Sequence, residues 1–474
     1  MRSIQFPASS GGRGGSTVSI VNGLAIAFGG ADRNGTLFSD VLSVDAARGR
    51  IDAVTPAEGS TAVEPLGGHA AATVSLDWTW AGVESVEGGG GGQVSGKVVE
   101  PVSLTRRSGD ERMVVFGGMN FTAEATLSGL WEWAPLGGGE STARQDGSAV
   151  GSGAGGPIAG AWRAVNTEGI SPQGRTGHTM HAVPPPIVLA PHPSGNASLD
   201  DAAGPPAPIV TLGNILGADT RESIIVLFGG STPDDGPLND TWLLRARAPP
   251  GPLTGGAPSY EWEHVAFKGT PPAPRELHAA FVRPAIVRLV AAAPGTGAGA
   301  GEVGATRVRV LAPPALVVHG GRCEDGSPRP DLCVLDLATR TWLQQTRAPH
   351  ARCAAAAAPT PCGLRLLQYG GQASLAELAR GAIELDTSGA TLEAEGMDAD
   401  EAKGLRPSEW RWRALPAPVA APLRFAAAAA ALPARSGISK GPGACTLVVV
   451  GGMTAIEDLA EAILLDVPVD ALEA

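Results

Sequence analysis

The sequence predicts an all-β protein: a β-propeller of six blades, with four antiparallel strands in each blade. Three observations support this prediction. An apolar run that ends on Gly-Gly recurs six times, a second β-rich segment follows each copy, and Trp and Arg residues recur at regular distances. Short strands repeated in this way are typical of radially repeated β folds. The Gly-Gly pairs mark the predicted blade cores and are Gly29-Gly30, Gly117-Gly118, Gly229-Gly230, Gly320-Gly321, Gly370-Gly371 and Gly451-Gly452.

The first segment of each repeat, such as IIVLFGG at 224–230, is predicted to be a buried strand that ends in a sharp bend. Its apolar residues are continuous and do not alternate, which indicates a strand covered on both faces. Glycine allows the positive φ angles and the close packing that such a bend needs. We therefore expect the Gly-Gly pairs to be part of the scaffold, and not phosphate-binding loops.

The next two segments complete the predicted blade. A polar loop leads from Gly-Gly to a third strand, for example LNDTWLLR at 238–245. The outer strand that follows usually carries a Trp, whose large side chain is suited to packing between blades. These residues are Trp162, Trp262, Trp342 and Trp412, while the first repeat has Ile51 in that place.

The innermost strand of a blade is preceded by an Arg that follows the Trp by 10 to 13 residues. In two repeats a His stands three positions after the Arg. The members of this motif are Arg175 with His178, Arg275 with His278, Arg352 and Arg424, while His69 occurs without the Arg. Because the three His residues share one repeat position, we expect them to be mainly structural.

Together these motifs resemble the kelch repeat, and the resemblance covers nearly all of residues 1–474. It implies a single kelch-type propeller domain. In kelch domains that bind peptides, the repeat Arg lines one mouth of the central channel. The resemblance thus implies a binding site at the mouth, where a ring of guanidinium groups would suit carboxylates or phosphates of a partner. Its candidate residues are Arg175, Arg275, Arg352, Arg424, His178 and His278; the alternative is that the arginines brace loops between blades.

Closure of the ring and the long insertions are also predictable. The last repeat lacks an outer strand, and we expect MRSIQF at the N-terminus to supply it, in preference to VPVDALEA at the C-terminus. Such closure removes an exposed strand edge. Segments rich in Gly, Ala, Pro and Ser are predicted to be flexible surface inserts. They lie near 84–100, 136–159, 184–220, 289–307 and 387–407.

The composition excludes several classes of protein. The net charge of −12 gives no overall attraction to nucleic acid or to anionic membranes. The segment GGRGG at 11–15 is therefore expected to be a flexible end, and not an RNA-binding element. The five cysteines contain no C-x-x-C pair, which favours free thiols in a reducing compartment. No signal-peptide-like or membrane-spanning run occurs, so we expect a cytoplasmic or nuclear monomer.

No catalytic constellation is evident, so we expect no metal and no cofactor. Copper radical oxidases are propellers that need two ligand tyrosines and a Cys–Tyr crosslink, and this chain has only Tyr260 and Tyr369. The iron-binding spacing of nitrile-specifier-type kelch proteins is missing. We predict a non-enzymatic platform that binds an acidic peptide or protein segment at the propeller mouth. One alternative is an enzyme acting on a sugar-like or carboxylated substrate in the channel. Another is the kelch portion of a multi-domain relative, such as a tRNA-modifying methyltransferase.

Overall fold

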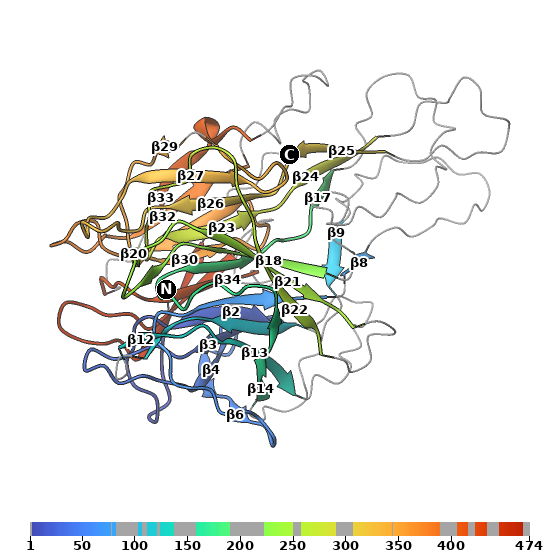
Figure 1. The fold of residues 1–474 in the computed structure, drawn as a ribbon. Coiled ribbons are helices and arrows are strands. Elements are labelled where there is room, and N and C mark those ends of the chain that lie inside the picture. The colour runs from blue at the N-terminus through green and yellow to red at the C-terminus, as the bar shows by residue number, and fades with distance from the viewer. Residues whose placement is uncertain are drawn as a thin grey trace, which may run out of the picture.

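A computed structural model shows the fold of the chain (Figure 1). It describes residues 2–76, 78–81, 103–106, 111–120, 124–136, 158–189, 222–249, 257–290, 307–343, 345–388, 405–415, 422–433 and 445–467. These residues form β-strands, turns and one short 3₁₀ turn, η3 (Pro407–Glu409). The predicted all-β class is confirmed.

Each blade is built on antiparallel strands, and in blades 1 to 5 these strands follow chain order from the centre outward. Blade 1 comprises β2 (Thr17–Val21), β3 (Leu24–Phe28), β4 (Val41–Asp45) and β5 (Arg50–Ala53). Blade 2 comprises β7 (Ala70–Val74), β10 (Arg112–Phe116), β13 (Leu130–Leu136) and β14 (Ala159–Val165). Blade 3 comprises β16 (Thr179–Ala182), β18 (Glu222–Phe228), β21 (Thr241–Arg247) and β22 (Ser259–His264).

Blades 4 and 5 follow the same order, whereas in blade 6 the N-terminal strand lies outermost. Blade 4 comprises β23 (Ala279–Arg283), β26 (Ala315–His319), β27 (Asp331–Asp336) and the short β28 (Thr341–Trp342), with β29 (Thr346–Arg347) also paired to β27. Blade 5 comprises β30 (Ala356–Pro359), β31 (Arg365–Tyr369), β32 (Ala382–Asp386) and β33 (Arg411–Leu415). Blade 6 comprises β34 (Ala428–Pro433), β35 (Cys445–Val450), β36 (Glu461–Val467) and β1 (Arg2–Gln5).

The inner strands form a closed ring. Strand β2 contacts β7 and β34, β16 contacts β7 and β23, and β30 contacts β23 and β34. Each blade therefore touches the next around one central axis, and blade 6 touches blade 1. The six-bladed propeller predicted from the repeats is confirmed.

The two ends of the chain meet in blade 6. Strand β1 pairs antiparallel with β36, with Ile4 opposite Ala462. Ile4 and Phe6 are buried in the core shared by blades 6 and 1. The N-terminal strand thus supplies the missing outer strand, as the sequence predicted, and it covers the edge of β36.

A ring of backbone hydrogen bonds ties the six blades together ahead of their inner strands. The amide of Gly15 donates to the carbonyl of Ala426 at 2.8 Å, and that of Gly68 donates to Gly15 at 2.9 Å. The same link continues from blade to blade until the ring is complete. Its six members all have positive φ and are Gly15, Gly68, Gly177, Leu277, Ala354 and Ala426.

Aromatic residues join the blades farther from the axis. Phe28, the residue before Gly-Gly in blade 1, lies 4.5 Å from Trp162 of blade 2 between ring centroids. The corresponding distances are 5.1 Å for Phe116 and Trp262 and 5.4 Å for Phe228 and Trp342. The outer-strand Trp residues therefore pack on the preceding blade, as their predicted role requires.

Several short strands stand outside the blade sheets. A three-stranded sheet contains β17 (Ile187–Leu189), β24 (Ile286–Val290) and β25 (Arg307–Ala312), and β8 (Trp78–Ala81) pairs with β9 (Ser103–Arg106). Two further pairs join β11 (Met119–Asn120) to β12 (Ala125–Thr126) and β19 (Ser231–Thr232) to β20 (Gly236–Pro237). By contrast, β6 (Thr55–Pro56) and β15 (Thr167–Glu168) extend the sheets of blades 2 and 3, because they pair in parallel with the outer strands β14 and β22. Most of the predicted inserts lie outside the described residues, but β17 falls inside the one predicted at 184–220, where composition predicted no strand.

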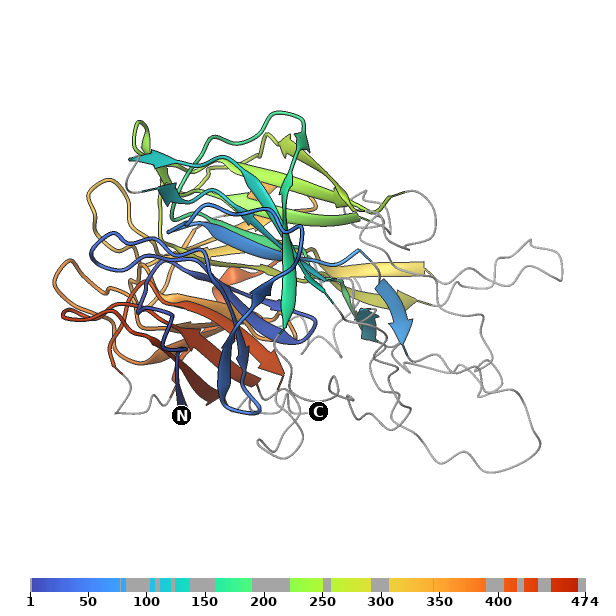
Figure 2. The same ribbon diagram turned by 90° about the horizontal axis from the view of Figure 1, so that it is seen from below.

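The loops after the Gly-Gly pairs all emerge at one face of the ring. This follows because neighbouring strands are antiparallel, so the second strand of every blade ends on the same side. We call these connections the tip loops: residues 31–39, 119–120 with 124–129, 231–239, 322–330, 372–380 and 453–460. Strands β12 and β20 of the tip loops lie on the side of the ring opposite β8, β9, β24 and β25 (Figures 1 and 2).

Candidate functional site

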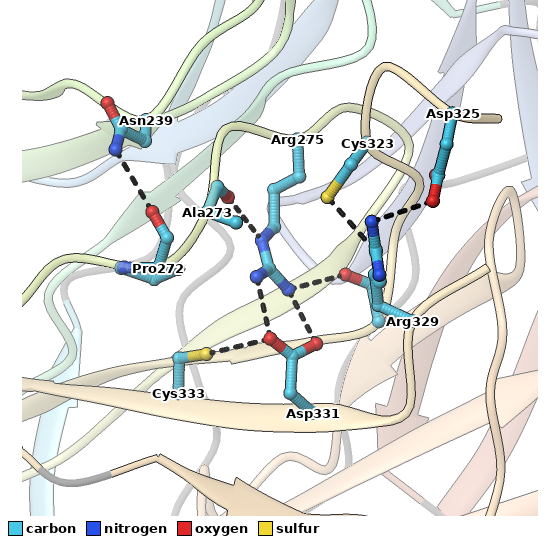
Figure 3. Close-up of polar contacts among 10 residues, drawn as sticks. Asn239, Pro272, Ala273, Arg275, Cys323, Asp325, Arg329, Asp331 and Cys333 are labelled. Carbon is cyan, nitrogen blue, oxygen red and sulfur yellow. Dashed lines mark hydrogen bonds and ion pairs between the residues drawn. The ribbon is translucent and has the colours of Figure 1, made fainter. Parts of the chain in front are cut away.

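The repeat arginines were the predicted site, and Arg275 of blade 4 shows how they are held (Figure 3). Its Nη1 and Nη2 donate to Oδ1 and Oδ2 of Asp331 at 2.8 and 2.7 Å. Nη1 also donates to the carbonyl of Gly320 at 2.9 Å, and Nε donates to that of Ala273 at 3.0 Å. Burial alone would raise the pKa of Asp331, but the hydrogen bonds and charge of Arg275 outweigh it, and the pKa is lowered.

The same arrangement recurs in other blades. Arg175 pairs with Asp240 in blade 3 and donates to Gly229 at 3.0 Å. Arg424 donates to Gly451 and to Glu461 in blade 6, at 2.8 and 2.7 Å. In each case the carboxylate belongs to the residue at, or just before, the start of the third strand, and the carbonyl to the first glycine of the pair.

Blade 1 has a repeat arginine that the sequence analysis missed. Arg13 is buried, pairs with Asp40 and donates to the carbonyl of Gly29 at 3.2 Å. The interpretation of GGRGG at 11–15 as a flexible end was therefore wrong. The detectable signal was its distance from the apolar run at Thr17, which equals the distance from Arg175 to Thr179.

Blades 2 and 5 depart from the pattern. In blade 2 the Arg position is Leu66 and the acidic position is Gly129, so both partners are replaced together. In blade 5 the acid alone is replaced, by Gly381. Arg352 therefore donates to three carbonyls, those of Gly370, Gly381 and Arg380, at 2.8, 3.2 and 3.2 Å. Burial without a carboxylate lowers the pKa of Arg352 to about 10.

The four predicted arginines are buried inside their blades. Arg175, Arg275 and Arg424 are fully buried and Arg352 is 5% exposed. Their guanidinium groups are occupied by carboxylates and carbonyls of their own blades. The geometry favours the bracing alternative, because the four side chains are buried and their Nη groups are bonded within their own blades, although Nε of Arg352 and Nε of Arg424 have no acceptor in the part of the chain that the structure describes.

The repeat histidines are also held between blades. His178 stacks edge-on against Phe116 of the preceding blade, with ring centroids 5.8 Å apart. His278 makes the same contact with Phe228, and its Nε2 lies 2.9 Å from Oγ1 of Thr179. Burial lowers the pKa of His278 to about 3 and that of His178 well below its ordinary value. Both rings are therefore neutral packing elements at physiological pH.

The Gly-Gly pairs leave room for these residues. Gly117 has φ of +72°, and a Cβ there would lie 2.6 Å from the carbonyl oxygen of Arg175 and 2.7 Å from Cε1 of His178. Only glycine fits such a position without moving backbone. The spacing of Gly-Gly, Arg and His therefore recurs among the repeats because adjacent blades pack closely at these residues.

The two tyrosines are likewise structural. Tyr260 is buried, and its hydroxyl donates to Oε2 of Glu132 in the neighbouring blade at 2.6 Å. Burial and the Glu132 charge raise its pKa well above the ordinary value. The hydroxyl of Tyr369 donates to the carbonyl of Pro422 at 3.4 Å.

Most charged side chains that the tip loops expose are acidic. The tip loops of blades 5 and 6 also expose large apolar side chains. Leu375 and Ile456 are 74% and 82% exposed. The exposed acids outnumber the exposed bases, although Asp325 is paired with Arg329. The charged side chains are Glu124, Asp234, Asp235, Glu324, Asp325, Glu377 and Glu457 against Arg33, Arg322, Arg329 and Arg380. These residues are not evident in the sequence, because their types vary from one loop to the next and form no repeated motif.

Among the residues that the structure describes, no group of three or more His, Cys, Asp and Glu side chains is arranged to hold a metal ion. The same residues contain no helix of the length and hydropathy needed to cross a membrane.

Comparisons with known proteins give little further information. No family model and no curated protein matches the chain. A solved chain that is similar in shape comes from a structure titled "Cryo-EM structure of RAG in complex with one melted RSS and one unmelted RSS". The two are 11% identical with a TM-score of 0.49, over 98% of this chain and 99% of that one. A similarity of this degree carries no inference about function.

Proposed function

We propose that the chain is a non-enzymatic platform for protein–protein interaction, which binds its partner through the tip loops. The observation that carries this proposal is the presentation of these loops. A closed ring, secured by β1 and by the backbone hydrogen bonds, holds the loops of all six blades at one face. Loops fixed on a rigid scaffold are a common arrangement for binding sites.

The charge of the tip loops indicates which charge the partner surface should carry. An acidic segment was expected because the repeat arginines were expected to be free at the mouth. Those arginines are engaged internally, whereas exposed side chains such as Glu377 and Glu457 carry negative charge. Complementary potentials favour association and like charges oppose it. The tip loops therefore favour a basic partner surface over an acidic one.

Affinity capture from a lysate of the source cells tests this function. The baits are the wild-type chain, a tip variant (Glu377→Lys with Glu457→Lys) and a matched control (Glu58→Lys with Glu168→Lys) in which the same number of exposed acids is reversed outside the tip loops. We expect one protein to be retained in stoichiometric amount by the wild type and the control, and to be lost from the tip variant.

Other results contradict the proposal in distinct ways. Stronger capture by the tip variant indicates an acidic partner, and equal capture by all three baits places the interface away from the tip loops. If no protein is captured but a sugar-like or carboxylated small molecule copurifies and is converted, the channel enzyme replaces the platform.

A further inference from the structure

Two neighbouring tip loops differ from the others at a single repeat position. The fourth residue after the Gly-Gly pair is Asn34, Asp234 and Asp325 in blades 1, 3 and 4. In blades 5 and 6 it is Leu375 and Ile456, which are 74% and 82% exposed. The internal repeat thus provides its own comparison: the scaffold accepts a polar residue here, yet two adjacent blades carry large apolar side chains.

The local backbone supports this equivalence. In blade 1 the amide of Asp32 donates to the carbonyl of Thr36 at 3.0 Å, and in blade 5 the amide of Ala373 donates to that of Glu377 at 2.9 Å. Each bond starts two residues after its Gly-Gly pair and closes a turn around the tip residue. Leu375 therefore occupies the place of Asn34. Its Cδ2 faces Gly326 in the tip loop of blade 4, where an added Cβ would lie 3.6 Å away, and most of the side chain remains exposed.

A third exposed apolar side chain lies between these two loops. Leu423 is 36% exposed and precedes Arg424, whose carbonyl accepts a hydrogen bond from the amide of Gly371 in blade 5 at 2.8 Å. The next residue, Phe425, is bridged to Met453 at the start of the blade 6 tip loop. Leu423 is thus placed between the loops that carry Leu375 and Ile456. We call these three residues the apolar patch.

Negative charge lies beside the patch. Glu377 and Glu457 are exposed and stand two residues and one residue after the apolar tips. Arg380 is the exposed base of these two loops. Exposed apolar side chains on adjoining segments, with acidic side chains beside them, are a feature of interaction surfaces.

We propose that the apolar patch docks a partner-protein segment that carries Leu-like side chains next to lysine or arginine. The proposal rests on the proposed function, and it names the surface and the chemistry of the partner. Apolar contacts supply the affinity, and the two glutamates select basic flanking residues.

Binding of defined peptides to the full chain tests this proposal. The probe is a fluorescein-labelled peptide of Leu and Lys, and its comparison peptides contain Leu and Glu, or Ser and Lys, in the same order. The patch variant is Leu375→Asn with Ile456→Asn, which installs the residue type of Asn34 at both tips. The matched control is Ile170→Asn, because Ile170 is 81% exposed but belongs to the connection between blades 2 and 3.

We expect the Leu-Lys peptide to bind the wild type and Ile170→Asn equally, and the patch variant at least about tenfold more weakly, or about 1.4 kcal/mol. The two comparison peptides should bind the wild type more weakly by a similar factor. Equal binding by the patch variant overturns the proposal, as does a Ser-Lys peptide that binds as well. Tighter binding of the Leu-Glu peptide also overturns it.

The capture experiment described above keeps the two proposals separate. If the captured partner is lost from the Glu377→Lys, Glu457→Lys variant but retained by the patch variant, the platform stands and the apolar patch is wrong. If the wild type captures no protein and binds no peptide, the platform itself is wrong.

Discussion

Arg175 and Asp240 form a two-armed ion pair inside blade 3, with Nη1 2.6 Å from Oδ1 and Nη2 2.8 Å from Oδ2. The arginine side chain is fully buried, whereas the aspartate side chain is 30% exposed. The pair fastens the segment before the inner strand to the start of the third strand, and Nη1 also reaches the carbonyl of Gly229 at 3.0 Å. Such a pair braces the blade at its tip-loop end.

Removing the carboxylate should be costly. Asp240→Asn leaves a fully buried guanidinium without a charge partner, so we expect a loss of about 3 kcal/mol in the free energy of unfolding. Denaturant titration measures this loss. The control Asp235→Asn lies at the exposed loop tip, and we expect it to change stability by less than about 0.5 kcal/mol. Equal effects of the two substitutions would show that the ion pair does not brace the blade.

Replacing both partners should cost less than the sum of the single replacements. The double variant Arg175→Leu with Asp240→Gly reproduces the combination found in blade 2, where Leu66 and Gly129 occupy these positions. We expect a favourable coupling energy of about 1–3 kcal/mol in the double-mutant cycle, since the two residues share one interaction. A coupling near zero would contradict the pairing.

Glycine should stabilise the backbone ring where alanine now stands. Ala426 has φ of +53°, a conformation in which a side chain costs about 1 kcal/mol or more. We expect Ala426→Gly to raise the free energy of unfolding by a similar amount. Ala71→Gly, within the extended strand β7, should instead lower it by about 0.5–1 kcal/mol. Thermal unfolding of both variants checks the prediction, and destabilisation by Ala426→Gly would refute it.

Stability should fall as the pH drops below about 6.5. Burial lowers the pKa of His69 and of His278 to about 3, so both imidazoles stay neutral in the folded chain at pH values where they take up protons in the unfolded chain. Their contribution is complete above the unfolded pKa and is lost toward the folded values, by about 1.4 kcal/mol per pH unit for each residue. Urea titrations between pH 7 and pH 5 measure the slope. His278→Gln should reduce the slope, and an unchanged slope would contradict this account.

The N-terminal strand should be needed for a stable ring. Deleting residues 2–5 exposes the edge of β36 and removes the buried Ile4 from the core between blades 6 and 1. We expect the melting temperature to fall by several degrees and the variant to aggregate. Arg2→Ala, which keeps the strand, is the control, because Arg2 is exposed. A melting temperature equal to that of the wild type would show that β1 does not close the propeller.

The fold was predictable because packing between blades requires particular residue types at the same positions of several repeats. Gly229 must be glycine for steric reasons, and Trp262 must fill the space beside Phe116, so both leave a periodic signal. Arg13 carried the same signal but was hidden in a glycine-rich segment that is typical of flexible ends. The closing role of β1 followed from counting strands.

The site was less predictable. The sequence located Arg175 correctly, but its use depends on whether a carboxylate reaches it, and the partner Asp240 stands 65 residues away. The apolar patch was missed because Leu375 looks like an ordinary loop leucine until it is aligned with Asn34 of blade 1. Exposure, which only the structure shows, separates an apolar residue at the surface from one in the core.

Hydrogen exchange of the chain with and without its captured partner shows directly which loops bind that partner. We expect slower exchange on binding in the tip loops at 372–380 and 453–460, and in the segment 422–424 between them. Backbone amides of the inner strands should be unchanged. Protection confined to segments on the opposite face, such as β8, β9, β24 and β25, would contradict the claim that this protein binds through its tip loops.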